Sequence, residues 1–325
     1  MDCTGRYNLF ISPSEYGHYS NYYRLLKEDS PLPTKMHVYR SLYALLKIVL
    51  IKQRKLAIPE NIVFLFGERF YLTAIILRLF GFKTSLFFYY VQNNPTNKLR
   101  KNLIVLLLKF LKYLEIKTVS IENPTKLPSD LFSAVIFDVV SGNISKLQRE
   151  DDVIRVMGYI DKRKNLKNII IALSILCKDR NKLTLEIIGK VDKNYLQELS
   201  VLIGNAQNSN LKILLLNDSI NNKIFIEKLS SAGLVIAYNE NYYGSSGIVL
   251  ESINQKTPVI FCANGPLTCL SKYFNYDPNT DLKRLITLAL TKRQYFIFQN
   301  RDLAGFRSTR NQRVFSYSFW SILYE

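Results

Sequence analysis

A loop rich in glycine and serine at residues 244–247 has the composition of an anion-binding site. The apolar run 234–237 before it is typical of a buried strand, and residues 248–253 after it are typical of a helix that begins at a serine cap. Residues 258–261 are the next apolar run and complete a strand–helix–strand unit. Because the N-terminus of a helix presents free backbone N–H groups and a positive partial charge, we expect this loop to bind phosphate.

A second candidate anion site contains three consecutive basic residues, Lys162, Arg163 and Lys164. They follow a predicted strand at 153–157 and precede a predicted helix at 166–177. Basic side chains at the start of a helix add to its positive partial charge, and this combination suits a diphosphate. The alternative is a solvated basic turn. The position after a strand, where α/β sheets bind ligands, favours the ligand site.

The first half of the chain offers a comparable loop at residues 13–19, between a predicted strand at 7–12 and a predicted helix at 20–27. A loop after the first strand lies at the carboxyl edge of the sheet, where ligands bind. His18 lies in this loop, and it is either an ordinary loop histidine or a residue that faces the ligand. His37 has no comparable context and is interpreted as structural.

Strands and helices that position these residues alternate along the whole chain. The predicted strands are 7–12, 61–66, 84–91, 118–121, 134–140, 153–157, 183–188, 211–216, 234–237 and 258–261. Such alternation in both halves predicts an α/β fold of two Rossmann-like, doubly wound domains that face a cleft. The polar segment 141–152 is interpreted as the linker. We therefore expect an N-terminal domain at 1–148, a second domain at 149–306 and a terminal helix at 307–325.

The composition is that of a basic globular protein. The chain has 325 residues, of which 48% are hydrophobic and 22% are charged. Lys and Arg number 44 against 26 for Asp and Glu, and the net charge of +18 indicates acidic partners such as nucleic acid, anionic lipid or phosphorylated ligands. The four cysteines lack the spacing of metal ligands. No apolar run resembles a signal peptide or a membrane-spanning helix, so we expect a cytoplasmic protein.

The predicted helix at 99–114 is basic and amphipathic. Lysines that fall within one narrow arc of this helix are Lys98, Lys101, Lys109 and Lys112, and apolar residues cover much of the remainder. Two interpretations remain open: a domain helix with a solvated lysine edge, or an interfacial helix that rests on anionic lipid. A second basic apolar segment at 38–54 and the net charge of +18 make the membrane surface an expected partner.

Three stretches in the second half occur in a recognisable order: GYIDKRKNLKNIIIAL, LTLEIIGK and LVIAYNENYYGSSGIVLESINQKTPVI. In this order they resemble the nucleotide-sugar-binding domain of retaining glycosyltransferases with the B-type, two-Rossmann fold (glycosyltransferase family 4 and relatives). The resemblance covers roughly residues 150–300. Within it, the triplet Ser245-Ser246-Gly247 resembles that of divergent bacterial polysaccharide or O-antigen transferases. The aromatic segment 307–325 resembles the last helix of that family, which crosses back to pack on the first domain.

The resemblance implies a role for each candidate residue. Those implied to bind the donor nucleotide are Arg163, Lys164, Gly189, Ser245, Ser246, Gly247 and Glu251. Lys164 and Arg163 would contact the diphosphate, the glycine loop would donate to phosphate, and Glu251 would accept the vicinal hydroxyls of the ribose. The family has a further glutamate eight positions before Glu251, where this chain has Tyr243; Glu240 is the nearest acid and would take that catalytic role in a longer loop. His18 is carried over as a residue that faces the sugar or the acceptor.

The implied function is transfer of a sugar from a nucleotide-diphosphate sugar, of UDP or GDP type, to a hydroxyl of a saccharide or lipid-linked saccharide. The resemblance implies retention of configuration and no metal ion or other cofactor. We expect this hexosyltransferase-type enzyme at the inner face of a bacterial cell membrane, in surface polysaccharide synthesis. One alternative is a basic nucleic-acid-binding protein, although no nucleic-acid motif occurs in the chain and we expect no nucleic-acid partner. Another is a sugar-nucleotide epimerase on the same fold, which would not require a separate acceptor.

Overall fold

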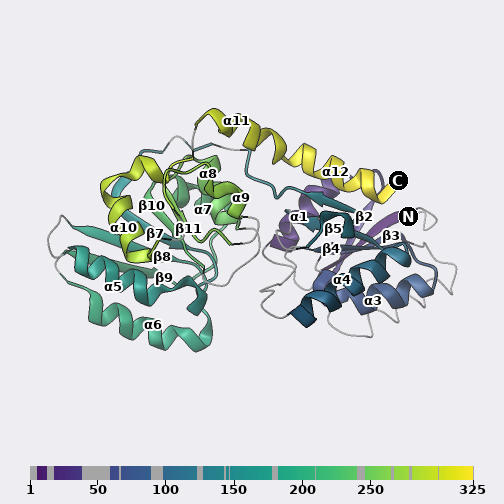
Figure 1. Cartoon of the computed structure of the whole chain (residues 1–325), viewed down its shortest axis with the longest axis horizontal. Helices are drawn as coiled ribbons and strands as arrows, with labels where there is room; N and C mark the ends of the chain where they lie inside the picture. Colours follow the sequence, from purple (N-terminus) through teal and green to yellow (C-terminus); the bar gives the residue numbers. More distant parts are fainter. Residues whose placement is uncertain are drawn as a thin grey trace. The chain divides into compact units, whose positions relative to one another are not determined.

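The apolar runs of the sequence form two parallel β-sheets in the structure, which is a computed structural model of the chain (Figure 1). The structure describes residues 6–12, 18–38, 59–65, 67–88, 98–122, 127–142, 144–145, 147–177, 182–208, 210–239, 246–264, 267–277, 280–298 and 300–324. Parallel sheets with helices between their strands confirm the predicted α/β class.

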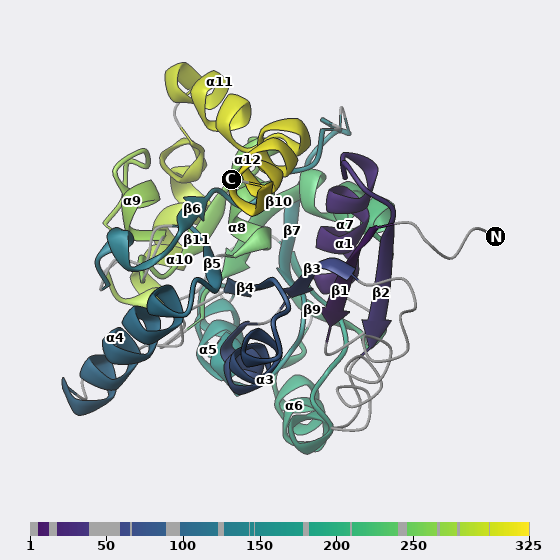
Figure 2. The same ribbon diagram turned by 90° about the vertical axis from the view of Figure 1, so that its right-hand side faces the viewer.

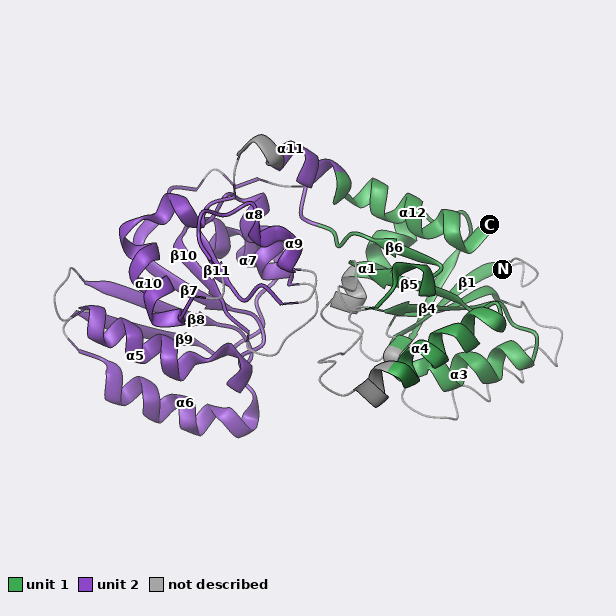
Figure 3. Cartoon of the chain, viewed as in Figure 1, with its two compact units in different colours: residues 1–139, 243–245, 309–325 green, residues 140–242, 246–308 purple. Residues whose placement is uncertain are grey.

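The chain divides into two compact units, which Figure 3 shows in green and purple. Unit 1 comprises residues 1–139, 243–245 and 309–325, and unit 2 comprises residues 140–242 and 246–308. The compact units divide at 139/140 and 308/309, whereas the sequence suggested divisions at 148/149 and 306/307.

Unit 1 contains a sheet of six described strands in the order β2-β1-β3-β4-β5-β6. The strands are β1 (Tyr7–Ser12), β2 (Thr34–Val38), β3 (Pro59–Phe64), β4 (Thr84–Phe88), β5 (Lys117–Ile121) and β6 (Ala134–Ile136). The helices are α1 (His18–Glu28), α3 (Gly67–Leu79), α4 (Lys98–Tyr113) and α12 (Gln312–Tyr324). The sequence did not predict β2, in which His37 is exposed, and most of the basic segment 38–54 lies outside the described residues.

Alternate side chains of β1 point to two separate parts of the core, one on each face of the sheet. Leu9 and Ile11 pack with residues of α3 and α4, whereas Phe10 packs with residues of α1 and α12. Figures 1 and 2 show α12 on the opposite side of this sheet from α3 and α4. Both faces of the sheet are therefore covered by helices, as parallel sheets require.

The last helix, α12, is fastened to unit 1 by polar contacts and aromatic packing. Arg310, just before the helix, donates from both terminal nitrogens to the buried carboxylate of Glu122, with an Nη2–Oε2 distance of 3.0 Å. Nη1 of Arg310 also donates to the backbone oxygen of Asp138 at 3.3 Å. Further along, the indole Nε1 of Trp320 donates to the backbone oxygen of Leu26 in α1 at 3.0 Å. The terminal helix is thus an integral part of unit 1.

Unit 2 contains a sheet of five described strands in the order β11-β10-β7-β8-β9. The strands are β7 (Glu150–Met157), β8 (Leu183–Ile188), β9 (Leu211–Leu216), β10 (Ala232–Ala237) and β11 (Val259–Phe261). The helices are α5 (Leu166–Leu176), α6 (Lys193–Ala206), α7 (Asn222–Ser230), α8 (Gly247–Asn254), α9 (Thr268–Ser271), α10 (Leu282–Thr291) and α11 (Asn300–Thr309). Helix α5 lies next to both α6 and α10, and α7 lies next to α8. None of the described helices of the chain combines the length and the apolar character of a membrane span.

Candidate functional site

The carboxyl ends of β7 and β8 touch at two glycines. Gly158 follows β7 with a φ of +95°, and its N–H donates to the backbone oxygen of Ile188 at 3.0 Å. Gly189 follows β8 with a φ of +138°, and a Cβ at that position would lie 1.8 Å from the backbone oxygen of Gly158. The N–H of Gly189 donates to the backbone oxygen of Leu216 at 3.0 Å. Gly189 is therefore required where the two strand ends meet.

Lys164 is buried beside these strand ends. It closes a short 3₁₀ helix (Lys162–Lys164), and its side chain is only 6% exposed. Its Nζ lies 3.9 Å from the position that a Cβ on Gly158 would occupy. Burial lowers the pKa of Lys164 from 10.5 to about 8, although the neighbouring Asp161 carboxylate opposes the shift. No hydrogen-bond acceptor for this Nζ is found among the described residues.

The other two basic residues of this turn form ion pairs at the surface. Arg163 donates from Nε and Nη2 to Oδ2 of Asp161, at 2.9 and 2.6 Å. Lys162 forms an exposed salt bridge with Glu198 at 2.8 Å. Asp161 also caps the 3₁₀ helix, because its side chain accepts from the backbone N–H of Arg163. Of the three basic residues, Lys164 is therefore the one whose side chain is buried next to Gly158.

The first turn of helix α8 lies beside the same glycine. Ser246 caps the helix, since its hydroxyl accepts from the backbone N–H of Val249, and Gly247 is the first helical residue. Ile248 in the same turn places its Cδ1 3.1 Å from the position of a Cβ on Gly158. The structure thus brings the first turn of the serine-capped helix and Lys164 to the same glycine.

Glu251 lies one turn further along α8 and is buried, with 9% of its surface exposed. Its Oε1 accepts from the backbone N–H of Ser141, and its Oε2 accepts from the Ser141 hydroxyl at 3.0 Å. Nδ2 of Asn254 donates to the same Oε2 at 3.2 Å. Glu251 is therefore not a solvated helix residue, and it holds the chain where unit 2 begins.

Three candidate residues have side chains outside the described part of the chain. The backbone of His18 begins α1, so it lies at a helix N-terminus rather than in the loop that we expected at 13–19. Its side chain is not among those described. Glu240 and Ser245 lie entirely outside the described residues.

Sequence reasoning missed several polar residues around this site. Tyr159 donates its hydroxyl to Oδ2 of Asp192 at 2.8 Å, and this bond raises the pKa of Tyr159 and lowers the pKa of Asp192. Asp192 also caps α6. Ser141 and Asn254 contact Glu251, and Ser141 is 110 residues away from it in the chain. In the sequence, Ser141 is the first residue of the polar segment interpreted as the linker. No local pattern indicates that it contacts Glu251.

Two parallel-sheet units of this kind define the B-type glycosyltransferase fold, and solved structures of that fold match over the whole length. HepE (Alr3699) of Anabaena, in complex with UDP and glucose, has 14% sequence identity and a TM-score of 0.69, with 98% of this chain and 99% of that chain covered. A glycosyltransferase of Rickettsia africae has 13% identity and a TM-score of 0.64, with 98% of each chain covered. MurG of Acinetobacter baumannii has 13% identity and a TM-score of 0.57, with 98% and 100% covered.

The family comparison adds the class of enzyme. Residues 142–293 match the family described as glycosyl transferases group 1. No curated protein matches the chain in sequence. This match and the fold together identify the chain as a glycosyltransferase of B-type fold. The predicted enzyme class is confirmed.

Proposed function

We propose that this enzyme transfers a sugar from a nucleotide-diphosphate sugar to a hydroxyl of a saccharide or lipid-linked saccharide. The observation that carries the proposal is the convergence of Lys164 and the first turn of α8 on Gly158, at the carboxyl edge of the unit 2 sheet. A buried ammonium and a helix N-terminus together suit a diphosphate. The complexes of HepE with UDP and with UDP-glucose support a uridine nucleotide as the first candidate, with GDP as the second.

In this proposal Lys164 contributes to the chemical step as well as to binding. The bond between the anomeric carbon and the diphosphate oxygen breaks, and negative charge develops on the departing diphosphate. The acceptor hydroxyl oxygen bonds to the same carbon, and its proton passes to the departing phosphate oxygen. A positive charge placed beside the diphosphate stabilises that transition state. Because Lys164 is buried, water screens this interaction less than at the surface. A bound diphosphate also favours the charged form of Lys164 over the neutral form.

The remaining roles follow the family resemblance. Ser245, Ser246 and Gly247 donate to phosphate, and Arg163 exchanges its contact with Asp161 for the diphosphate. Glu251 accepts the ribose hydroxyls, Glu240 contacts the transferred sugar, and His18 faces the sugar or the acceptor. We propose that configuration is retained and that basic residues and the helix dipole supply the charge that a metal ion supplies elsewhere. The pathway proposed is bacterial surface polysaccharide synthesis, including O-antigen.

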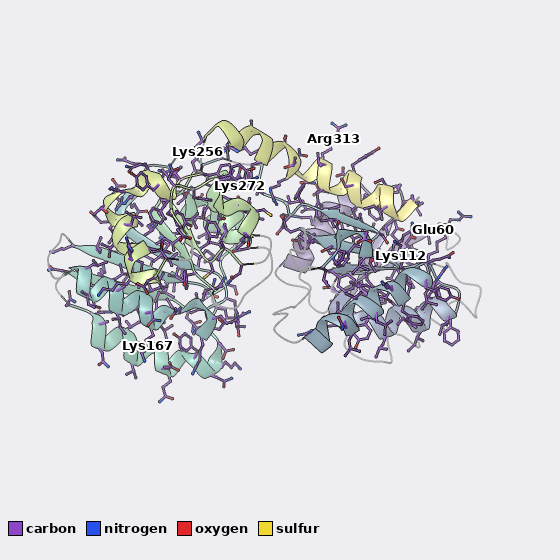
Figure 4. The ribbon with its side chains drawn as sticks, viewed as in Figure 1. Glu60, Lys112, Lys167, Lys256, Lys272 and Arg313 are labelled. Atoms are coloured by element: carbon purple, nitrogen blue, oxygen red, sulfur yellow. The ribbon has the colours of Figure 1, made fainter. Side chains whose placement is uncertain are left out.

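The proposal includes attachment of unit 1 to an anionic membrane surface at the cytoplasmic side. Large apolar side chains between 41% and 82% exposed lie on α3, α4 and the residue after α3: Leu72, Ile76, Leu79, Phe80, Leu103, Leu106, Phe110 and Tyr113. Lys109 and Lys112 are exposed on α4 among them. Lys112 is labelled in Figure 4. Apolar side chains that enter the headgroup region beside lysines that meet anionic lipid are the pattern of an interfacial helix.

Binding of UDP, GDP, ADP and TDP, measured by calorimetry, tests the donor site. We expect one nucleotide to bind, and we expect Lys164→Ala to weaken its binding at least about tenfold, because hydrogen bonds to charged groups contribute about 1.5–3 kcal/mol. Lys162→Ala is the matched control in the same turn, since that lysine is exposed and paired with Glu198. It should change the dissociation constant less than about twofold. Equal affinity of Lys164→Ala and wild type would refute the assignment.

A further inference from the structure

Hydrogen bonds within the protein hold the carboxylate of Glu251 in one orientation. Both of its oxygens accept hydrogen bonds from Ser141, and Oε2 accepts a further bond from Asn254. Glu251 is 9% exposed and Asn254 is 1% exposed, so water competes little with these bonds. A glutamate with three rotatable bonds would otherwise lose freedom on binding a ligand, and that loss would reduce affinity.

Asn254 is itself held in one orientation. Nε of Arg307 donates to Oδ1 of Asn254 at 3.0 Å, and Nη2 of Arg307 donates to the Asn254 backbone oxygen. Since Arg307 is a donor only, Oδ1 must face it and the amide nitrogen must face the other way. That nitrogen donates to the backbone oxygen of Ser141 at 2.9 Å as well as to Glu251. Arg307, Asn254 and Ser141 therefore form a fixed frame around the carboxylate.

This frame lies one turn along the helix whose beginning forms the proposed phosphate site. Gly247 and Glu251 are four residues apart in α8, so they share a face and are separated by about 6 Å along the axis. The distance between the diphosphate and the ribose hydroxyls of one nucleotide is of similar size. A single rigid helix therefore presents both groups to one ligand.

We propose that Ser141 and Asn254 are positioning residues for the donor nucleotide. They hold the Glu251 carboxylate in the orientation that accepts the 2′ and 3′ hydroxyls of the ribose. This inference rests on the proposed function, which assigns the ribose to Glu251. Ser141 touches neither the phosphate site nor the transferred sugar in this scheme, and it acts through Glu251.

The test compares UDP with 2′-deoxy-UDP, because the ratio of their dissociation constants reports the contact with the ribose hydroxyl. Wild type should bind UDP about tenfold more tightly than 2′-deoxy-UDP, as expected for a hydroxyl bonded to a carboxylate. Ser141→Ala keeps the backbone N–H but loses the hydroxyl bond of 3.0 Å, and we expect the ratio to fall about threefold. Lys164→Ala should weaken both nucleotides equally and leave the ratio unchanged.

A double-mutant cycle shows whether Ser141 acts through Glu251. Ser141→Ala should add no further loss of UDP affinity in a Glu251→Ala background. Ser145→Ala is the matched control in the same segment, because within the described part of the chain the Ser145 hydroxyl accepts a local bond from the N–H of Leu147 and does not contact Glu251. Asn254→Ala provides a second variant if Ser141→Ala does not fold, and melting temperatures verify folding of each protein.

Each outcome separates this inference from the proposal on which it rests. A ratio unchanged in both Ser141→Ala and Asn254→Ala would overturn the positioning role and leave the donor site intact. Equal binding of UDP and 2′-deoxy-UDP by wild type would overturn the ribose assignment of Glu251, and the inference with it, while Lys164 stands. If the nucleotide screen selects GDP, then GDP and 2′-deoxy-GDP replace the uridine pair. Binding of none of the four nucleotides would overturn the proposed function itself.

Discussion

The charged side chain of Lys164 is buried and almost excluded from water. Its side chain is 6% exposed, and burial lowers its pKa from 10.5 to about 8. The unfolded chain therefore binds this proton more tightly than the folded protein does. In the absence of an anion, the charged form opposes folding. Such a cost is common at functional sites, where stability is given up for binding.

Lys164→Met should stabilise the protein while it weakens nucleotide binding. The pKa difference of about 2.5 units, from 10.5 to about 8, corresponds to about 3 kcal/mol at most. The gain in the free energy of unfolding should be fully present below pH 8 and should shrink as pH rises toward 10.5, where lysine is neutral in the unfolded chain as well. Urea unfolding at pH 7 and pH 9.5 measures it.

Lys167→Met is the control for this comparison, because Lys167 is an exposed lysine at the start of α5, labelled in Figure 4. It should change stability by less than about 0.5 kcal/mol at either pH. A destabilised Lys164→Met variant at pH 7 would show that the lysine stem packs in a way methionine cannot replace. That result would contradict a destabilising effect of the buried charge.

Two glycines, Gly158 and Gly189, allow the ends of β7 and β8 to come into contact. The sequence marked Gly189 as a glycine at a strand exit, and the structure adds why no other residue fits there: a Cβ would lie 1.8 Å from a backbone oxygen.

The edge strand β2 was not predicted from the sequence. Its residues alternate between half-buried and exposed, so it lacks the continuous apolar run of a central parallel strand. It pairs with β1 alone among the described strands.

Gly189→Ala should destabilise the protein by more than about 3 kcal/mol, because the positive φ and the contact with Gly158 both forbid a side chain. Gly204→Ala is the matched control within the same unit. Gly204 lies in α6 with no atom within 4 Å of its would-be Cβ, so alanine should stabilise by about 0.5–1 kcal/mol. Thermal unfolding of both variants checks the contrast. Similar melting temperatures for the two would contradict it.

At the scale of the whole molecule, the net charge of +18 requires an explanation beyond one nucleotide site. The membrane attachment proposed for unit 1 provides one, because Lys109 and Lys112 are exposed among the apolar side chains of α3 and α4 and would meet anionic lipid. The basic amphipathic pattern of α4 was visible in the sequence. The contribution of α3 was not, because its apolar residues are distributed around the helix and some of them pack in the core.

Sedimentation with lipid vesicles tests this surface. We expect the protein to bind vesicles that contain phosphatidylglycerol and to bind pure phosphatidylcholine vesicles much less. Leu106→Glu combined with Phe110→Glu should reduce binding at least about tenfold, because each large apolar side chain contributes about 1.5–3 kcal/mol when buried. Val201→Glu on α6 of unit 2 is the matched control, since Val201 is 58% exposed. A double variant that sediments like wild type would assign membrane binding to another surface.

Local chemistry and local pattern were enough to predict the α/β class, the serine-capped helix and the basic turn. Strands of a parallel sheet are buried on both faces, so they leave continuous apolar runs in a sequence. A helix cap and a strand exit depend on residues within a few positions of each other, such as Ser246 and Val249. These features need no knowledge of the rest of the chain.

The contacts that make a site depended on tertiary packing. Lys164 and Ile248 meet at Gly158 because β10 pairs with β7, and no periodicity in the sequence announces that pairing. Glu251 is bonded to Ser141, 110 residues earlier, because the chain enters unit 2 beside the last turn of α8. The loop of glycine and serine thus predicts a phosphate site, but strand order determines which residues lie near it. Strand order brings distant residues together without leaving a local signal in the sequence.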